Sequence, residues 1–149
     1  MMEQNAQNGF DALRLENQMC FPLYAAAREV TKLYRPYLDA LNLTYTQYIT
    51  MMVLWECGEC SVKALGDKLF LDAGTLTPVL KNMESKGFVR RVRSREDERM
   101  LIVTLTDKGR ALKERAKSVP AQVGSCIRLT PEEAQTLYRL LYKLLDTIE

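Results

Sequence analysis

The sequence predicts a mainly α-helical protein with one small β-hairpin. Three observations lead to this fold class: apolar residues recur at helical spacing over most of the chain, alternation typical of strands is confined to about residues 88–105, and no Pro- or Gly-rich stretch marks a linker. The chain has 149 residues, of which 47% are hydrophobic and 27% charged, enough to bury one core. We therefore expect a single domain over residues 1–149.

The N-terminal part predicts two helices. The first runs from about Phe21 to Ala40, and Pro36 is expected to bend or shorten it. The second begins at Thr44, where Gln47 three residues later completes a capping box. Its inward residues are expected to be Ile49, Met52, Val53 and Trp55.

The middle part predicts a helix-turn-helix followed by a wing. One short helix starts after Ser61, and the next follows Asp72 and ends at Gly87, which suits a left-handed C-cap. The segments FVRRVRS and RMLIVTLT then alternate as strands do and are joined by the charged REDE, which predicts a two-stranded hairpin. A hairpin directly after the second helix of a helix-turn-helix is a wing.

The C-terminal part turns helical again from Thr106, with an interruption near Pro120. Its last helix opens at Thr130, with Pro131 and Glu133 in favoured cap positions. This helix carries an apolar stripe formed by Leu137, Leu140, Leu141, Leu144, Leu145 and Ile148. So small a domain has little left for the stripe to cover, so a helix from a second subunit is the expected partner.

The predicted helix-turn-helix carries residues suited to duplex DNA. Thr75, Thr77 and Pro78, at the start of the second helix, fit base edges in the major groove. Cations for phosphates crowd the same region: Lys81, Lys86, Arg90, Arg91, Arg93 and Arg95. At the wing tip Arg99 could enter an A·T-rich minor groove, its guanidinium held by a bidentate pair with Asp97. The alternative is that these cations only solvate an exposed face.

Composition narrows the remaining function classes. The net charge is only +2, so the placement of charge matters more than its sum. Histidine is absent, which argues against hydrolases and zinc sites, and we expect neither a metal nor a cofactor. No signal segment or apolar run long enough to cross a bilayer is visible, so a cytoplasmic location with reduced thiols is expected.

Two sequence blocks resemble a known family. LDAGTLTPVLKNMESKGFVRRVRSREDERMLIVTLTDKG resembles the winged helix-turn-helix of the MarR family, whose wing has a D-x-R element matched by Asp97 and Arg99. Together with LENQMCFPLYAAAREVTKLYRPYLDALNLTYTQY it resembles the OhrR branch, bacterial repressors that sense organic hydroperoxides. The resemblance covers about residues 15–118. It implies a homodimer on a pseudo-palindromic operator, with the winged module at about 44–106 and dimerisation helices at about 10–42 and 107–149.

Cys20 is the candidate sensor. Pro22 fits the first turn of a helix, which places Cys20 at a helix N-terminus, where unpaired amides and the helix dipole favour a thiolate. The resemblance assigns the peroxide-reactive role to Cys20, with Tyr34 and Tyr45 of the other subunit near its sulfur and Tyr24 as a further candidate. At position 22 the family usually has alanine. The alternative is that Cys20 is a buried space-filler.

The other three cysteines have different expected roles. The resemblance places Cys126 where some relatives carry a second cysteine, which would form an intersubunit disulfide with Cys20. Cys57 and Cys60 lie in a short link between helices, CGEC, and we interpret them as an incidental pair.

The predicted function is therefore a DNA-binding repressor, not an enzyme, that oxidation of Cys20 releases from its operator so that a peroxide-detoxification gene is expressed. Two rivals stay open: a MarR-type repressor released by a noncovalent phenolic ligand, and a thiol peroxidase that uses the same cysteine.

Overall fold

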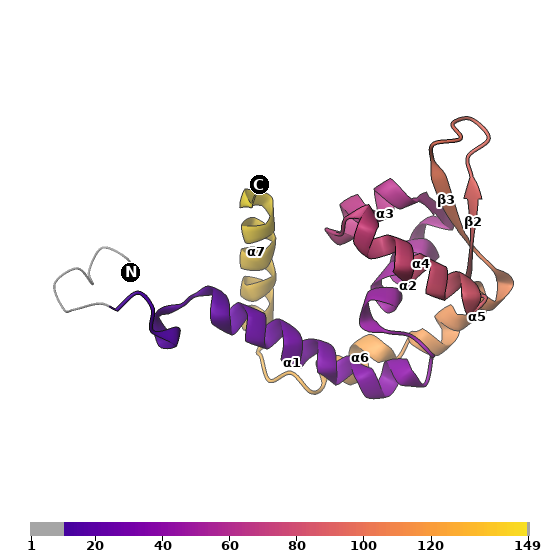
Figure 1. Ribbon diagram of the computed structural model, residues 1–149. Helices are drawn as coiled ribbons and strands as arrows, with labels where there is room; N and C mark the ends of the chain where they lie inside the picture. The colour runs from indigo at the N-terminus through magenta and orange to yellow at the C-terminus, as the bar shows by residue number, and fades with distance from the viewer. Residues whose placement is uncertain (1–10, 149) are drawn as a thin grey trace. The chain divides into compact units, whose positions relative to one another are not determined.

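The computed structural model describes residues 11–148, which form two compact units, residues 11–116 and 117–148 (Figure 1). The first unit contains the 3-10 helix η1 (Leu15–Asn17), α1 (Cys20–Asp39), α2 (Tyr45–Cys57), β1 (Glu59–Ser61), α3 (Val62–Leu69), α4 (Ala73–Ser85), β2 (Val89–Arg93), β3 (Leu101–Leu105) and α5 (Asp107–Ala116). The second contains α6 (Val119–Gly124) and α7 (Pro131–Thr147). The outer limits of the two predicted dimerisation segments, residues 10 and 149, lie outside the described residues.

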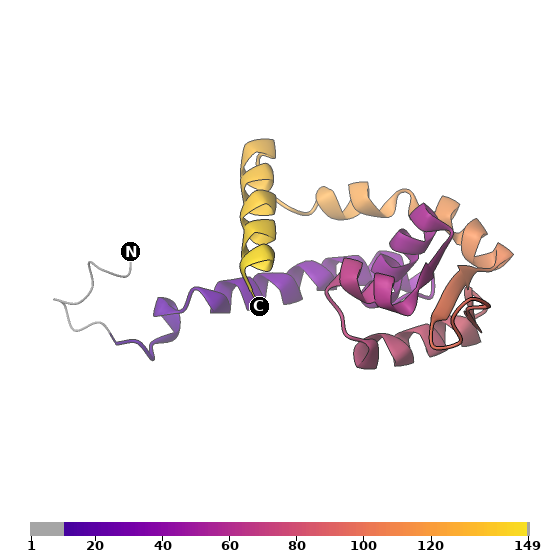
Figure 2. The same ribbon diagram turned by 90° about the horizontal axis from the view of Figure 1, so that it is seen from above.

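Helix α1 begins at Cys20, with Pro22 in its first turn, as the sequence predicted. Pro36 does not shorten it, because the helix continues to Asp39. Of its residues, all described, Leu38 alone is buried. Its N-terminal half extends away from the α2–α5 group in both views (Figures 1 and 2). A large part of α1 therefore has no packing partner within its unit.

Helix α2 supplies much of the core. The predicted capping box is present: Thr44 Oγ1 accepts from the Gln47 amide at 3.3 Å, and Gln47 Oε1 accepts from the Thr44 amide at 3.2 Å. The prediction that Met52 points inward is wrong: Met52 is exposed, whereas Met51 and Leu54 are fully buried. Half-buried Trp55 donates its indole N–H to the Gly109 carbonyl of α5 at 2.9 Å. This hydrogen bond ties α2 to α5.

The helix-turn-helix is held by caps on both helices. Ser61 Oγ accepts from the Ala64 amide at 3.1 Å, and Asp72 Oδ1 accepts from the Thr75 amide at 2.7 Å. In the turn between them, Phe70 adopts the left-handed conformation, with φ of 54°. The turn is tight: a Cβ placed on Gly66 would lie 2.5 Å from the Leu71 carbonyl oxygen. Glycine at this position is therefore a steric requirement of the turn.

The wing belongs to a three-stranded antiparallel sheet with strand order β1-β3-β2. The sequence predicted two of these strands and treated CGEC as a link between helices. The structure corrects this: Cys57 ends α2, whereas Cys60 lies in β1 and is paired with Val103 of β3. On the other side of β3, Arg91 of β2 is paired with the same Val103. The β2–β3 hairpin projects beyond the helices of its unit (Figure 1).

The second unit starts as predicted with a break before Pro120, the second residue of α6. Thr130 and Glu133 form the expected capping box at the start of α7. No residue of α7, whose whole length is described, is buried. Its large exposed apolar side chains are Leu137, Tyr138, Leu140, Tyr142 and Leu145. Over residues 11–148, no helix has the length and apolar character needed to cross a membrane.

Candidate DNA-binding surface and thiol sites

Helix α4 has one face turned toward the core and another exposed to solvent. Leu76, Leu80 and Met83 are fully buried and fix its orientation. The outward residues include those chosen from the sequence for base contacts and one cation: Thr75, Thr77, Pro78 and Lys81, all exposed. The Thr77 hydroxyl donates to the Ala73 carbonyl at 2.7 Å, which leaves its methyl group and an oxygen lone pair available. The side chains of Thr75, Thr77 and Pro78 are short and combine polar with apolar groups, which suits contacts to base edges in a major groove.

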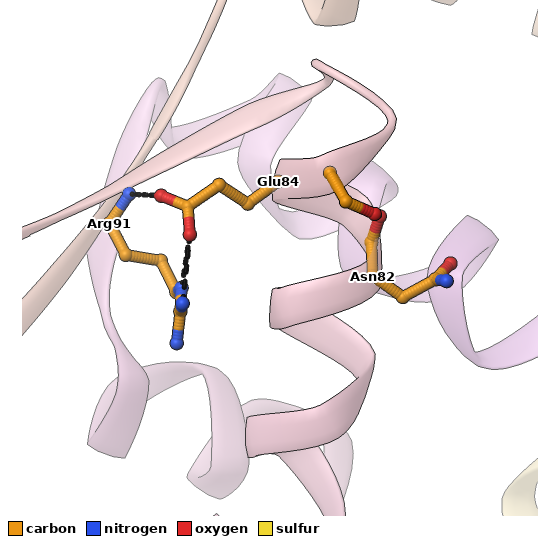
Figure 3. A network of polar contacts seen from close by, with 4 residues as sticks. Asn82, Glu84 and Arg91 are labelled. Carbon is orange, nitrogen blue, oxygen red and sulfur yellow. Dashed lines mark hydrogen bonds and ion pairs between the residues drawn. The ribbon is translucent and has the colours of Figure 1, made fainter.

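Arg91 of β2 is engaged within the protein. Glu84 of α4 accepts from the Arg91 backbone amide at 2.9 Å and from the guanidinium Nε and Nη2 at 2.9 and 2.8 Å (Figure 3). These hydrogen bonds hold the pKa of the Glu84 carboxyl below its ordinary value. The bonds fasten the wing to α4. A DNA contact by Arg91 stays a prediction.

Lys86 is also engaged. Its ammonium donates to the Asn42 carbonyl at 2.8 Å and to Gln47 Oε1 at 2.9 Å, and burial lowers its pKa. Gln47, itself buried, donates through Nε2 to Asn82 Oδ1 at 2.7 Å. This network links the α1–α2 connection to the end of α4. A capping role was all that could be predicted for Gln47, because its other partners are more than thirty residues away along the chain.

The cations that stay available line the outer surface. Within residues 11–148, the exposed side chains of Lys81 and Arg90 make no hydrogen bond or ion pair. Arg93 donates to the Glu98 carbonyl at 2.8 Å and stabilises the wing loop. The side chains of Lys81 and Arg90 are therefore accessible to phosphates.

The wing tip differs from the sequence prediction. Asp97 Oδ1 accepts from the backbone amide of Arg99 at 3.0 Å, and the described residues contain no ion pair between the two side chains. Asp97 therefore shapes the turn instead of clamping the guanidinium in a bidentate pair. Arg99 is exposed, so its side chain is accessible to a groove. In the D-x-R element, the Asp97 side chain is thus bonded to the backbone of Arg99 and not to its guanidinium.

The candidate sensor Cys20 is an exposed thiol at the first position of α1. Tyr34 and Tyr45 come together: their rings are 4.9 Å apart at 61°, and Tyr48, which the sequence did not single out, joins them. Burial raises the pKa of the Tyr45 phenol, with a smaller contribution from Tyr34. Burial likewise raises the pKa of the Tyr48 phenol, so Tyr45 and Tyr48 keep hydroxyls that can donate hydrogen bonds.

Cys20 and Tyr34 belong to the same helix and are separated along it. Fourteen residues at 1.5 Å each place them about 21 Å apart along the axis. Tyr24 does not join the cluster; it is exposed and contacts the Arg28 guanidinium at 5.4 Å. A site that combines Cys20 with Tyr34 therefore needs two chains.

All four cysteines are free thiols. Cys126 is exposed just after α6, in the second unit, where its Sγ lies 3.5 Å from the Gln122 carbonyl oxygen. Near the helix-turn-helix, Lys68 Nζ of α3 lies 3.6 Å from Cys57 Sγ. Among the residues that the structure describes, no group of three or more Cys, Asp or Glu side chains is arranged to hold a metal ion.

Fold and surface together define a winged-helix transcriptional regulator. A family model described as transcriptional regulator SarA/Rot matches residues 32–116. The chain is also 47% identical, over 142 residues, to the organic hydroperoxide resistance transcriptional regulator of Bacillus subtilis, covering 95% of this chain and 97% of that protein. The chain therefore belongs to the SarA/Rot-type, MarR-like transcriptional regulators. Its relatives are regulators, not enzymes.

Solved structures agree with this assignment. Reduced AbfR bound to DNA has a TM-score of 0.75 and 36% identity, covering 91% of this chain and 96% of that one. AbfR, a Staphylococcus epidermidis protein, is also known in a disulfide-formed state, with a TM-score of 0.63, 36% identity and coverage of 89% and 93%. Reduced MarR from E. coli has a TM-score of 0.69 and 27% identity, covering 86% and 96%.

Proposed function

We propose that this protein is a cytoplasmic repressor that senses organic hydroperoxides through Cys20 and then leaves its operator. The main support is the 47% identity to a hydroperoxide resistance regulator, which extends over 95% of this chain. The exposed Cys20 thiol at the first position of α1 adds to it. The DNA-bound AbfR structure supports a DNA partner. Release of the operator would allow expression of a peroxide-detoxification gene.

The chemistry at Cys20 is a two-electron oxidation. The Cys20 thiolate attacks the terminal oxygen of the hydroperoxide, an S–O bond forms as the O–O bond breaks, and the departing alkoxide takes a proton from solvent and leaves as the alcohol. Cys20 becomes a sulfenic acid. The phenols of Tyr34 and Tyr45 from the second subunit donate hydrogen bonds to the thiolate and to the departing oxygen. Their contact with each other supports this joint role.

Cys126 of the second subunit resolves the sulfenic acid. Its thiol attacks the Cys20 sulfur, water leaves, and an intersubunit disulfide forms. The exposure of both thiols and the disulfide-formed state of AbfR support this step. Because a disulfide requires Cα atoms within about 7 Å, its formation selects one arrangement of the subunits.

Operator binding uses the outward face of α4 and the wing. Thr75, Thr77 and Pro78 meet base edges, Lys81 and Arg90 meet phosphates, and Arg99 enters the minor groove. A symmetric dimer places two such modules on half-sites about 34 Å apart. An oxidised dimer that favours a different spacing by about 1.4 kcal/mol binds the operator tenfold more weakly.

The test measures operator binding by the Cys20→Ser variant. Fluorescence anisotropy of a labelled operator duplex reports the binding before and after treatment of the protein with cumene hydroperoxide. We expect wild-type affinity in the reduced state and no release by peroxide, because the serine hydroxyl is not oxidised. Cys57→Ser, a change at another exposed cysteine, should keep peroxide release. Release of the Cys20→Ser variant by peroxide would contradict the sensor role, and release of it by salicylate alone would favour the noncovalent rival.

A further inference from the structure

Cys57 and Cys60 lie at a junction of three elements. Cys57 is the last residue of α2, and Cys60 is the middle residue of β1. Between them Gly58 turns the chain with a φ of 78°, a left-handed conformation that glycine adopts at low cost. Only three peptide units therefore separate the two thiols, across a sharp change of direction.

Lys68 of α3 completes the cluster. Its ammonium lies 3.6 Å from Cys57 Sγ, and it also interacts electrostatically with Cys60. A cation at this distance stabilises a thiolate, the nucleophilic form of cysteine. Cys57 is exposed, so a small oxidant reaches it from solvent.

Cys60 is suited to the second step. It is half-buried, and burial together with the neighbouring Cys57 raises its pKa. A raised pKa makes Cys60 a poor direct nucleophile toward an oxidant, and Cys60 follows Cys57 by three residues across the Gly58 turn. The two thiols have different environments and hence different roles.

We propose that Cys57 and Cys60 form a second oxidation site, in which Cys57 reacts with a hydroperoxide and Cys60 closes an intrachain disulfide. The site acts independently of Cys20. In the first step the Cys57 thiolate attacks the terminal peroxide oxygen, an S–O bond forms as the O–O bond breaks, and the departing alkoxide takes a proton from solvent, which leaves an alcohol and a Cys57 sulfenic acid. In the second, the Cys60 sulfur attacks the Cys57 sulfur, the S–O bond breaks, and water leaves with the Cys60 proton.

The cluster favours oxidation over binding of a metal ion. The Lys68 ammonium lies 3.6 Å from Cys57 Sγ and would repel a metal cation bound to that sulfur. The residues described in the structure supply no third Cys, Asp or Glu ligand in a suitable group. A thiolate beside an ammonium instead matches the needs of a nucleophile.

The experiment uses the double variant Cys20→Ser/Cys126→Ser, which keeps only Cys57 and Cys60. Equimolar cumene hydroperoxide is added, and thiols, intact mass and non-reducing gel mobility are measured. We expect loss of both thiols, a mass decrease of about 2 Da and a monomeric band, all reversed by dithiothreitol. In the wild type, the tryptic peptide that contains both cysteines should show the same mass decrease, which keeps the test valid if the double variant folds poorly.

Two further variants test the assigned roles. Lys68→Gln should slow the loss of thiols by about tenfold, whereas Lys63→Gln, on the same helix, should leave the rate unchanged. Cys60→Ser, made in the double variant, should stop at a sulfenic acid that dimedone traps. Retention of both thiols, a mass gain from added oxygen in the double variant, or a covalent dimer through Cys57 would overturn the proposal.

Discussion

The carboxylate of Glu84 determines how one arginine of the wing is used. It accepts from both the backbone and the guanidinium of Arg91, and thereby joins β2 to α4. An arginine in a basic segment has the same appearance in the sequence whether it faces a phosphate or a carboxylate. At residue scale, the folded structure separates the cations that build the wing from those that remain available.

Replacing Glu84 by Gln should lower the free energy of unfolding by about 1–2 kcal/mol near neutral pH, because the charge-assisted bonds to Arg91 are lost. The folded state lowers the pKa of Glu84, so its stabilisation is present above the unfolded pKa and is lost as the pH falls through the folded value. The difference between wild type and variant should therefore shrink below about pH 4. Urea unfolding of both proteins at neutral and acidic pH measures this difference in the free energy of unfolding.

Glu96→Gln is the matched control, since Glu96 is an exposed wing residue whose carboxylate makes no hydrogen bond or ion pair within residues 11–148. Its stability should stay near that of the wild type at both pH values. A Glu84→Gln deficit that does not change with pH would show that packing, not charge, stabilises the junction.

The sequence predicted the candidate recognition face better than the cations around it. Asp72 as a cap and the spacing of Leu76, Leu80 and Met83 determine which side of α4 turns inward, so the exposure of Thr75 follows from local signals. Lys86 was assigned to phosphates, but its partners Asn42 and Gln47 precede it by about forty residues. Such contacts depend on tertiary packing and leave no local pattern.

At the scale of elements, the turn between α3 and α4 depends on one missing side chain. Gly66→Ala should lower the free energy of unfolding by about 1–3 kcal/mol, because the new Cβ would lie 2.5 Å from the Leu71 carbonyl oxygen. Gly124→Ala in α6 is the control, since nothing lies within 4 Å of its added Cβ. Chemical denaturation of both variants gives the comparison. Equal stability of the two would show that the turn relaxes.

Strand β1 was missed for a physical reason. It has three residues, Glu59–Ser61, and one of them caps the next helix. So short a strand shows no alternation, and it forms because β3 offers a free edge. Helices α2, α3, α4 and α7 were predicted more accurately, since a side-chain cap marks the start of each one.

For the whole molecule, the exposed apolar side chains concentrate on helices that single-chain packing leaves uncovered. None of α7 is buried, and α1 buries only Leu38. The sequence predicted the stripe on the last helix from its spacing alone. What the stripe covers could not be derived from one chain, because its partner is expected to be a second copy.

Leu137→Lys should weaken that association, because it places a charge within the apolar stripe of α7, at an exposed leucine. Sedimentation should show a shift from dimer toward monomer, with weaker operator binding in parallel. Gln135→Lys adds the same charge on the opposite side of the helix and should leave the dimer intact. An unchanged Leu137→Lys dimer would mean that the stripe is not the interface.

Trp55 gives the winged unit its own optical reporter. It is the single tryptophan of the chain, and its indole spans α2 and α5 through the bond to Gly109. Emission from this ring therefore follows the opening of residues 11–116, whereas residues 117–148 contribute no tryptophan signal. The Glu84 and Gly66 variants can thus be followed by intrinsic fluorescence, without a label on any of the four cysteines under study.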